Sequence, residues 1–369
     1  MPQIKKTGIG IIGCGNIAQA YFNGAKLFQN LYVVSCADLN MEVAKAKAEE
    51  NECTAQTVDE LLANPDVEMV VNLTIPAVHA KVSLAALEAG KHVYSEKPLA
   101  IDLEEAKKVM ETAEAKGLMV GCAPDTFLGG GYQTCRKLVD DGWIGKPIAG
   151  TAFLMSRGPE GWHPNPAFFY ERGAGPMLDM GPYYITALVN LLGPVKRVSA
   201  FATKAFDERM ATCKEQFGKM LPVSVPTHNA GLLEFHNGAV ITVTVSFDVY
   251  KHNHGPIEIY GTGGSLKAPD PNTFGGPIEL WTPSTKEWTP QSFSHPYLQN
   301  SRSIGAADMA ASIASGGKRK HRASGALAYH ALEVMLSFEK SSLDGKPVDI
   351  ESRPEQPEAL PMYLPEGMI

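Results

Sequence analysis

The sequence predicts an α/β protein in two parts: a parallel sheet with helices at the N-terminus, then an α+β part with an open, mainly antiparallel sheet. Residues 1–124 alternate short apolar runs with helical patterns, as repeated βα units do. After Pro124 several runs alternate apolar and polar residues, as a sheet covered on one face requires. We therefore divide the chain into domains at 1–124 and 125–369.

A glycine turn near the N-terminus indicates what the first domain binds. The apolar run Ile9–Ile12 predicts a buried strand, which ends in Gly13-Cys14-Gly15 where a helical pattern begins. Gly13 permits a tight turn, and Gly15 lets backbone N–H groups approach a pyrophosphate at the start of the helix. A strand before and a helix after this turn complete the dinucleotide fingerprint. We expect the cofactor to contact Gly13, Gly15, Asn16 and Ile17.

Asp38 narrows the choice of cofactor. It follows the second predicted strand, 32–37, where a carboxylate accepts both hydroxyls of a ribose and repels a 2′-phosphate. The next residues, Leu39 and Asn40, supply no arginine for such a phosphate. The sequence therefore favours NAD over NADP.

The other elements follow from periodicity and from turn residues. In the first domain we expect strands at 68–73, 91–95 and 118–122, and helices at 41–51, 58–63, 77–89 and between Asp102 and Gly117. In the second we expect helices at 131–141, 304–315 and 326–341, and strands at 148–155, 195–203, 230–236, 239–247, 257–260 and 278–281. Asn237-Gly238 predicts a hairpin turn, and Gly261–Gly264 a second turn.

Composition excludes several classes of function. The 369 residues are 44% hydrophobic and 20% charged, with a net charge of −7, which argues against nucleic acid as a partner. We expect no signal region, no membrane span and, from the scattered cysteines, a cytoplasmic location. The histidines and cysteines show no metal-ligand spacing, so no metal site is expected. We expect His330 to be a packed or capping histidine, and 318–322 to be a solvated loop.

Two groups of residues carry the expected chemistry. Lys97, in Ser95-Glu96-Lys97-Pro98, ends a predicted strand at the edge where a parallel sheet presents residues to a nicotinamide. A lysine there can move a proton to or from an alcohol. Asp179 and Tyr183 are four residues apart, so a helix beginning near Asp179 places both on one face. Asp179 can bind a sugar hydroxyl, and Tyr183 can pass a proton with Lys97.

The chain resembles the glucose-fructose oxidoreductase/inositol dehydrogenase (Gfo/Idh/MocA) family over nearly its whole length. The resemblance rests on the glycine turn, on residues 74–79 and 96–98, and on residues 175–183. It implies a Rossmann domain, an open-faced sheet domain and NAD(P)-dependent oxidation of sugars or cyclitols. It matches Lys97 to the family's catalytic lysine and Asp179 to its substrate-site aspartate, and it adds cofactor contacts at Thr74, Pro76, His79, Glu96 and Lys97.

The same resemblance bears on the substrate and on assembly. Tyr183 stands where many members have histidine, and Thr186 where Asp or Asn is common, which argues against inositol as substrate. Several further segments are expected to edge the cleft, since a tryptophan face with polar donors suits a pyranose ring. The expected substrate contacts are Asp125, Arg157, Trp162, His163, Asp179 and Tyr183. An uncovered apolar sheet face and the family pattern predict a homodimer or homotetramer through the C-terminal sheet.

Three functions remain open from the sequence. The first is an NAD-dependent sugar or polyol dehydrogenase that releases its cofactor. The second oxidises a glycoside at its 3-hydroxyl with tightly bound, recycled NAD, by hydride exchange with another sugar or by redox-assisted deglycosylation. The third is a non-catalytic NAD-sensing regulator, against which the joint presence of Lys97, Asp179 and Tyr183 argues.

Overall fold

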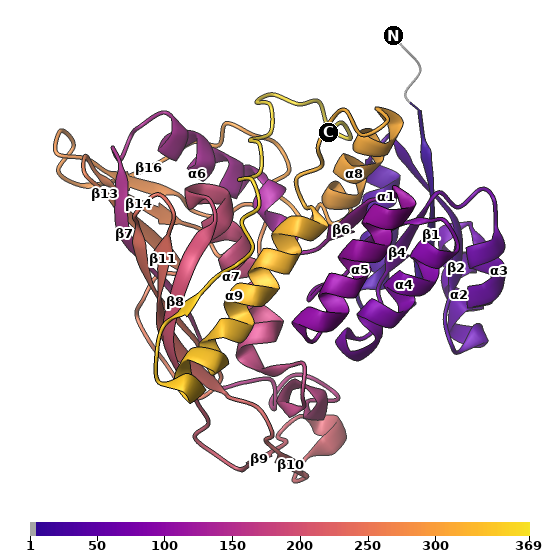
Figure 1. The fold of residues 1–369 in the computed structure, drawn as a ribbon, viewed down its shortest axis with the longest axis horizontal. Helices are drawn as coiled ribbons and strands as arrows, with labels where there is room; N and C mark the ends of the chain where they lie inside the picture. The colour runs from indigo at the N-terminus through magenta and orange to yellow at the C-terminus, as the bar shows by residue number, and fades with distance from the viewer. Residues whose placement is uncertain (1–4) are drawn as a thin grey trace. The chain divides into compact units, whose positions relative to one another are not determined.

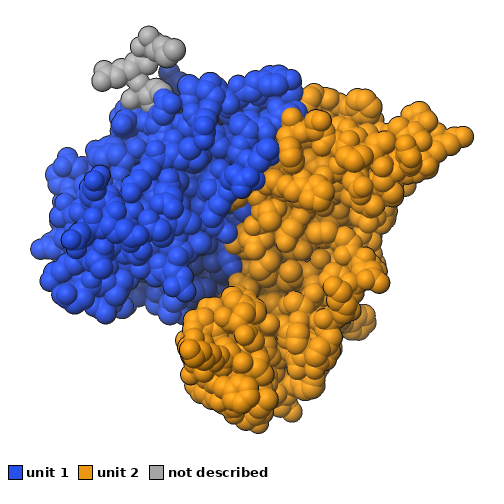
Figure 2. All heavy atoms as spheres, turned by 180° about the vertical axis from the view of Figure 1, so that it is seen from behind, with its two compact units in different colours: residues 1–130, 294–329, 358–369 blue, residues 131–293, 330–357 orange. Residues whose placement is uncertain are grey.

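The computed structural model describes residues 5–369, which form two compact units. Figure 2 shows the first unit, residues 5–130, 294–329 and 358–369, in one colour and the second, residues 131–293 and 330–357, in another. The expected division into 1–124 and 125–369 follows chain order, and the compact units do not. Two late segments, 294–329 and 358–369, belong to the unit that contains the glycine turn.

The first unit contains the predicted parallel sheet (Figure 1). Its strand order is β3-β2-β1-β4-β5-β6, and every pairing is parallel. Residues of β1 and β4 are buried at every position, which means that both faces of the sheet are covered, as predicted. The strands are β1 (Thr7–Ile12), β2 (Leu31–Ala37), β3 (Thr54–Ala55), β4 (Met69–Asn72), β5 (His92–Ser95) and β6 (Val120–Cys122).

Helix α5 (Leu103–Lys116) begins and ends at the expected capping residues, and α2 (Met41–Asn51) begins at a cap that the sequence analysis did not predict. Asn40 accepts the N–H of Glu42 and starts α2, and Asp102 accepts the N–H of Glu105 and starts α5. Gly117 ends α5 in the left-handed conformation. The other helices are α1 (Ala18–Leu27), α3 (Val58–Ala63), α4 (His79–Glu88), α8 (Ile304–Ala314) and the 3₁₀ turns η1 (Pro76–Val78) and η2 (Thr126–Leu128).

The second unit contains a nine-stranded sheet in the order β16-β15-β14-β13-β7-β12-β11-β8-β17. It is mainly antiparallel, with one parallel pairing between β7 and β12. The Asn237-Gly238 turn joins β11 to β12 as predicted, and Gly261 bonds Gly264 between β13 and β14. The strands are β7 (Pro147–Met155), β8 (Val195–Thr203), β11 (His228–Phe235), β12 (Val240–Ser246), β13 (Ile257–Gly261), β14 (Ser265–Ala268), β15 (Glu279–Trp281), β16 (Trp288–Pro290) and β17 (Val348–Asp349).

The two faces of this sheet differ. Helix α7 (Gly175–Leu192) packs on β7, β11 and β12, and α9 (Gly325–Asp344) bonds β8 through Ser341 (Figure 1). The side chains beneath α7 are buried, among them Ile241 and Val243. The opposite face exposes Phe201, Leu232 and Val240, with Phe201 76% accessible. The remaining helix of the unit is α6 (Gly130–Asp140).

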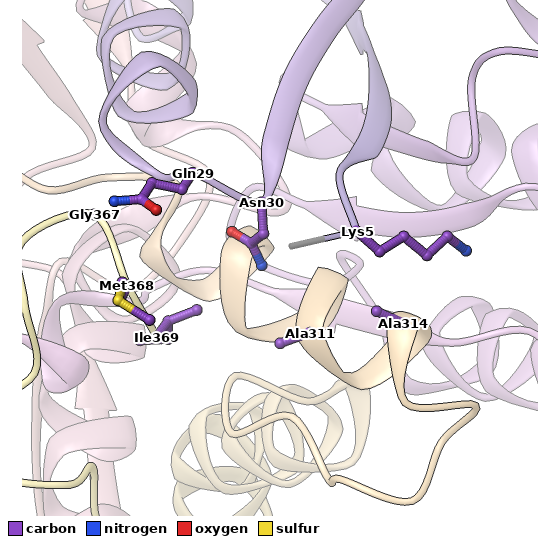
Figure 3. Close-up of a pocket in the computed structure, with 8 residues that line it drawn as sticks. All are labelled: Lys5, Gln29, Asn30, Ala311, Ala314, Gly367, Met368 and Ile369. Carbon is purple, nitrogen blue, oxygen red and sulfur yellow. The ribbon is translucent and has the colours of Figure 1, made fainter. Parts of the chain in front are cut away.

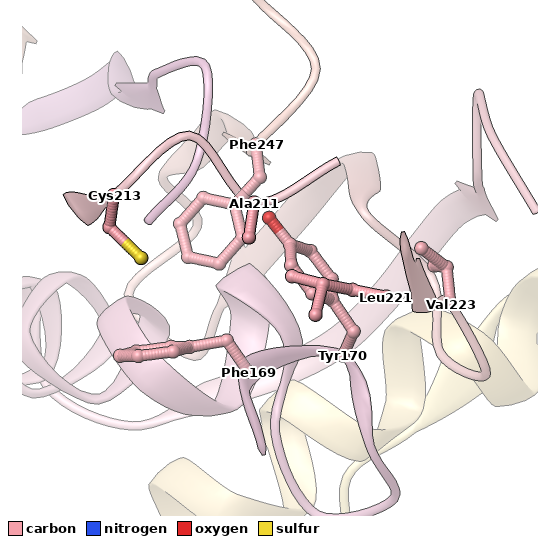
Figure 4. Close-up of a cluster of buried hydrophobic side chains, with 7 residues drawn as sticks. All are labelled: Phe169, Tyr170, Ala211, Cys213, Leu221, Val223 and Phe247. Carbon is pink, nitrogen blue, oxygen red and sulfur yellow. The ribbon is translucent and has the colours of Figure 1, made fainter. Parts of the chain in front are cut away.

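A second, smaller core supports the loops of the same unit. Figure 4 shows Phe169 and Tyr170 of η3 (Ala167–Tyr170) against Phe247, together with Ala211, Cys213, Leu221 and Val223. Leu221 lies in β10 (Met220–Pro222), which pairs with β9 (Glu208–Met210), and the other three residues follow these two strands. The sequence analysis did not predict this pair. None of the helices within residues 5–369 is both long and apolar enough to cross a bilayer.

Candidate active site

The glycine turn has the geometry that a bound pyrophosphate requires. Gly13 has φ of +100°, and a Cβ there would lie 2.6 Å from the carbonyl oxygen of Leu73, so only glycine fits. A Cβ on Gly15 would meet nothing within 4 Å, which leaves open space above this residue. The α1 N-cap residue, Ile17, has no side-chain capping bond. The start of α1 can therefore receive a phosphate, and the turn fits a dinucleotide.

Asp38 lies beside this turn at the carboxyl end of β2. Its Oδ2 accepts the N–H of Cys14 at 2.9 Å, and its Oδ1 accepts the N–H of Asn40 at 2.9 Å. Each carboxylate oxygen has a further lone pair, so the group can still accept ribose hydroxyls. Residues Leu39 and Asn40 are exposed and bring no positive charge.

The loop after β4 is tied to the segment after β5 by His79. The ring Nδ1 lies 2.7 Å from the carbonyl oxygen of Pro98, and Nε2 lies 2.9 Å from that of Thr74. His79 is buried, and this burial lowers its pKa, although both carbonyls and Glu96 favour the charged ring. Pro76 begins η1 in the same loop. Both ring nitrogens of His79 thus contact backbone carbonyl oxygens of the protein itself, and the expected cofactor contact of this residue stays a prediction.

Glu96 holds the backbone of Lys97. The Glu96 Oε2 accepts the Lys97 N–H at 2.9 Å, and its Oε1 accepts the hydroxyl of Tyr21 in α1 at 2.8 Å. Glu96 is only 7% exposed, so these two bonds satisfy a nearly buried carboxylate. The Lys97–Pro98 peptide is cis. Glu96 thus positions Lys97 at the carboxyl end of β5, the same sheet edge as the glycine turn. No sequence pattern pointed to Tyr21.

In the second unit, α7 brings Asp179 and Tyr183 to one helix face. The helix begins at Gly175, with Ala174 as its N-cap residue, so Asp179 lies in the second turn and is not a cap. Tyr183 follows one turn later and is buried, while Asp179 is partly exposed. The expected spacing on a common face is therefore present, with an earlier helix start than the sequence suggested.

Three of the expected substrate contacts lie on the loops around the smaller core. The Arg157 guanidinium lies 4.8 Å from the ring centre of Tyr250 and 5.3 Å from that of Phe206. Trp162 is 70% exposed and meets the His163 ring edge-on. The His163 Nδ1 accepts the N–H of Asn165. These side chains present aromatic surface and donors, as a sugar ring requires.

A buried charge network holds together the loops around the smaller core, which form one lobe of the second unit. The sequence analysis did not predict this network. Arg209 is 1% exposed on its side chain; its Nε bonds Glu160, and its Nη1 lies 2.7 Å from the Asp248 carboxylate. Its Nη2 donates to the carbonyl oxygen of Arg157. Asp248 also accepts the hydroxyl of Thr227 at 2.6 Å. The partners are 39 to 52 positions apart in the chain, a separation for which no local pattern exists.

Asp125 occupies a different environment from the cleft edge expected for it. It is fully buried in the first unit, and its Oδ2 accepts the N–H of Gly305 at 3.1 Å. Burial raises the pKa of this carboxyl to about 6, partly offset by Arg302. Asp125 therefore anchors the start of α8, and no part of its side chain reaches solvent.

Two further expectations concern the C-terminal region. His330 is packed, as predicted: Nε2 accepts the Val195 N–H at 3.0 Å, and Nδ1 contacts Ser352 at 2.8 Å. The expectation of a solvated loop at 318–322 was wrong for two arginines, because Arg319 and Arg322 both pair with the buried Asp308 at 2.6 Å. Among residues 5–369, no three His, Cys, Asp or Glu side chains form a metal cluster.

A pocket in the first unit lies away from these residues. Figure 3 shows its lining: Lys5, Gln29, Asn30, Ala311, Ala314, Gly367, Met368 and Ile369. Lys5 precedes β1 and Asn30 precedes β2, so the pocket lies at the amino ends of these strands. Ligands of parallel α/β sheets bind at the carboxyl ends, where the glycine turn lies.

Comparison with known proteins gives the family. Residues 7–123 match the sequence profile of the oxidoreductase family with an NAD-binding Rossmann fold, and residues 132–267 match the GFO/IDH/MocA C-terminal domain. D-glucoside 3-dehydrogenase of Escherichia coli is 30% identical over 254 residues, covering 65% of this chain and 70% of that protein. The chain belongs to the Gfo/Idh/MocA oxidoreductase family.

Other relatives agree with this assignment. The 1,5-anhydro-D-fructose reductase of Ensifer adhaerens is 29% identical over 262 residues, which is 70% of this chain and 74% of that protein. The structure of levoglucosan dehydrogenase in complex with NADH superposes with a TM-score of 0.79 at 21% identity, covering 94% of this chain and all of that one. The chain is thus an NAD-binding oxidoreductase of a family whose named members include sugar and inositol dehydrogenases.

Proposed function

We propose that the protein oxidises a secondary hydroxyl of a sugar or polyol, with NAD as hydride acceptor. The observation that carries this proposal is the placement of Lys97. Glu96 and Tyr21 fix its backbone at the sheet edge that also bears the glycine turn and Asp38. Bound NAD would supply the hydride acceptor, and Gly13, Gly15 and Asp38 are the residues that would hold it.

The proposed roles of the side chains follow from their chemistry. Lys97 takes the proton of the reacting hydroxyl as the carbon loses hydride, and Tyr183 relays that proton. Asp179 accepts a hydrogen bond from the same hydroxyl or its neighbour and orients the ring. The helical spacing of Asp179 and Tyr183 supports this pairing, since both lie on one face of α7. Trp162, His163 and Arg157 would contact the rest of the sugar.

The second candidate function is oxidation of a glycoside at its 3-hydroxyl with NAD that stays bound. A relative named D-glucoside 3-dehydrogenase favours it. Purified protein separates the candidates. Turnover with added NAD supports the dissociable dehydrogenase. The second is supported if NAD copurifies with the protein and no net NADH forms, while hydride is exchanged between sugars or an aryl glycoside is cleaved. Binding of NAD and sugar without any reduction supports a non-catalytic NAD-sensing regulator instead.

We further propose NAD as the preferred cofactor, the cytoplasm as location and a homo-oligomer as the assembly. Asp38 beside the turn, with no arginine at 39 or 40, supports NAD over NADP. The exposed Phe201, Leu232 and Val240 on the open sheet face support pairing of that face with a second copy. Light scattering of the purified protein should give a dimer or tetramer, and a monomer at micromolar concentration would refute the pairing.

A further inference from the structure

Three thiols converge beside the glycine turn, outside the groups used in the proposed reaction. Cys14 lies in the turn, Cys36 near the end of β2, and Cys53 directly before β3. The Sγ atoms of Cys53 and Cys36 are 3.9 Å apart, and the Cys36 thiol also interacts with that of Cys14. Cys14 and Cys36 are buried, whereas Cys53 is partly exposed. The three sulfurs therefore form a path from solvent to the turn.

The two neighbouring thiols differ in exposure and in pKa. The hydrogen bond with Cys36 lowers the pKa of Cys53, and Lys26 contributes in the same direction. The bonds to its two neighbours and burial raise the pKa of Cys36. An accessible thiolate is the nucleophile towards oxidants, and a buried thiol next to it can resolve the product. Cys53 is the partly exposed thiol of the three, so it is the reacting sulfur, and Cys36, 3.9 Å away, is its partner.

The geometry points to a reversible disulfide site between Cys53 and Cys36 that is oxidised by peroxides and weakens dinucleotide binding at the glycine turn. The Cys53 thiolate attacks one peroxide oxygen: an S–O bond forms, the O–O bond breaks, and the leaving hydroxide takes a proton. Cys36 then attacks the sulfenic sulfur, forming the S–S bond and releasing a second water. In sum, two thiols and hydrogen peroxide give one disulfide and two waters.

The consequence for the turn follows from the sheet contacts. A disulfide is about 2.05 Å long, so the two sulfurs must approach by nearly half of their 3.9 Å separation. Cys36 pairs with Ile11 of β1, and the next residue, Ala37, accepts the N–H of Gly13 at 2.8 Å. Asp38 in turn accepts the Cys14 N–H. A shift of Cys36 towards Cys53 therefore displaces the strand end that holds the turn.

The test uses the full chain and hydrogen peroxide as the oxidant. After mild treatment and alkylation, peptide mapping should show Cys36 linked to Cys53 and two of the six thiols lost. Calorimetry should show the Kd for NAD raised by about fivefold or more, within the usual range of coupling between sites, and restored by a dithiol. Cys36 and Cys53 that stay alkylatable, or a disulfide that leaves NAD affinity unchanged, would overturn the inference.

Three variants make the assignment specific. Cys53→Ser should bind NAD as the reduced protein does and lose its response to peroxide. Cys36→Ala should accumulate a sulfenic acid at Cys53, since the resolving thiol is absent. Cys213→Ala, in the core of the second unit, is the control and should stay sensitive. Equal sensitivity of Cys53→Ser and the control would refute the site. The NAD readout rests on the proposed function, but thiol mapping does not. A failure of the disulfide site can therefore be told apart from a failure of the proposed function.

Discussion

The two units hold their candidate residues by different means. In the first, Gly13, Asp38 and Lys97 lie at strand ends and are fixed by hydrogen bonds that backbone N–H groups donate. In the second, the lobe that bears Arg157 and Trp162 depends on Arg209, which bridges carboxylates far apart in the chain. Apart from the bond between Tyr21 and Glu96, the cofactor half is thus specified by local sequence, and the substrate half by long-range burial of charge.

The largest effect should come from the local half. Lys97→Ala removes the proposed general base, so kcat should fall by about 10²–10⁴-fold while NAD affinity stays nearly unchanged. Tyr183→Phe should also lower kcat, and the double variant should lose less than the product of the singles, because coupled groups are not additive. Steady-state kinetics with calorimetry of NAD binding checks both. Near-normal turnover of Lys97→Ala would remove the lysine from the mechanism.

The second effect tests the long-range half. Arg209→Met leaves Glu160 and Asp248 nearly buried without their partner, which should lower the free energy of unfolding by about 3–5 kcal/mol. Arg197→Met is the matched control, because Arg197 pairs with Glu234 on the exposed sheet face, where such a pair contributes at most about 1 kcal/mol. Urea unfolding measures both. Equal losses in the two variants would show that the lobe does not depend on the network.

The third effect is a pH dependence in the second unit. Burial lowers the pKa of His330 from 6.5 to about 4. The unfolded chain therefore takes up this proton at higher pH than the folded one, so His330 supports folding above pH 6.5 and loses that contribution as pH falls towards 4. The full loss is about 3 kcal/mol. His330→Gln should flatten the unfolding free energy over this range, and an unchanged slope would assign the acid sensitivity elsewhere.

The smallest effect concerns cofactor choice. Asp38→Ala loses hydrogen bonds to a charged acceptor, worth about 1.5–3 kcal/mol, which is at least about tenfold in the Kd for NAD. Asp38→Asn keeps an acceptor for the Cys14 N–H and removes the charge, so it should mainly narrow the gap between NAD and NADP. Titration calorimetry with both dinucleotides decides. Equal or tighter binding of NADP by the unmodified protein would contradict the preference for NAD.

The same contrast explains what could be predicted from the sequence. The strand, turn and helix around Gly13, the capping of α5, and the shared helix face of Asp179 and Tyr183 all follow from spacing within a few residues. The roles of Tyr21 and Arg209 do not, since their partners are 75 and up to 52 positions away. Asp125 was expected at a cleft edge because its burial is not visible in the local sequence. The residue that donates to its carboxylate, Gly305, is also far away in the chain.

Hydride transfer itself tests the central claim most directly. Pyranoses, cyclitols and aryl glycosides should be incubated with the protein and NAD while the absorbance of reduced nicotinamide is followed. The incubation with the active substrate should then be repeated with deuterium on the carbon that bears the reacting hydroxyl. The account predicts reduction of free or bound NAD by at least one sugar or polyol, with the deuterium found on the nicotinamide ring. Binding of NAD and sugar with no reduction of free or bound NAD, and no transfer of deuterium to the nicotinamide, would contradict it.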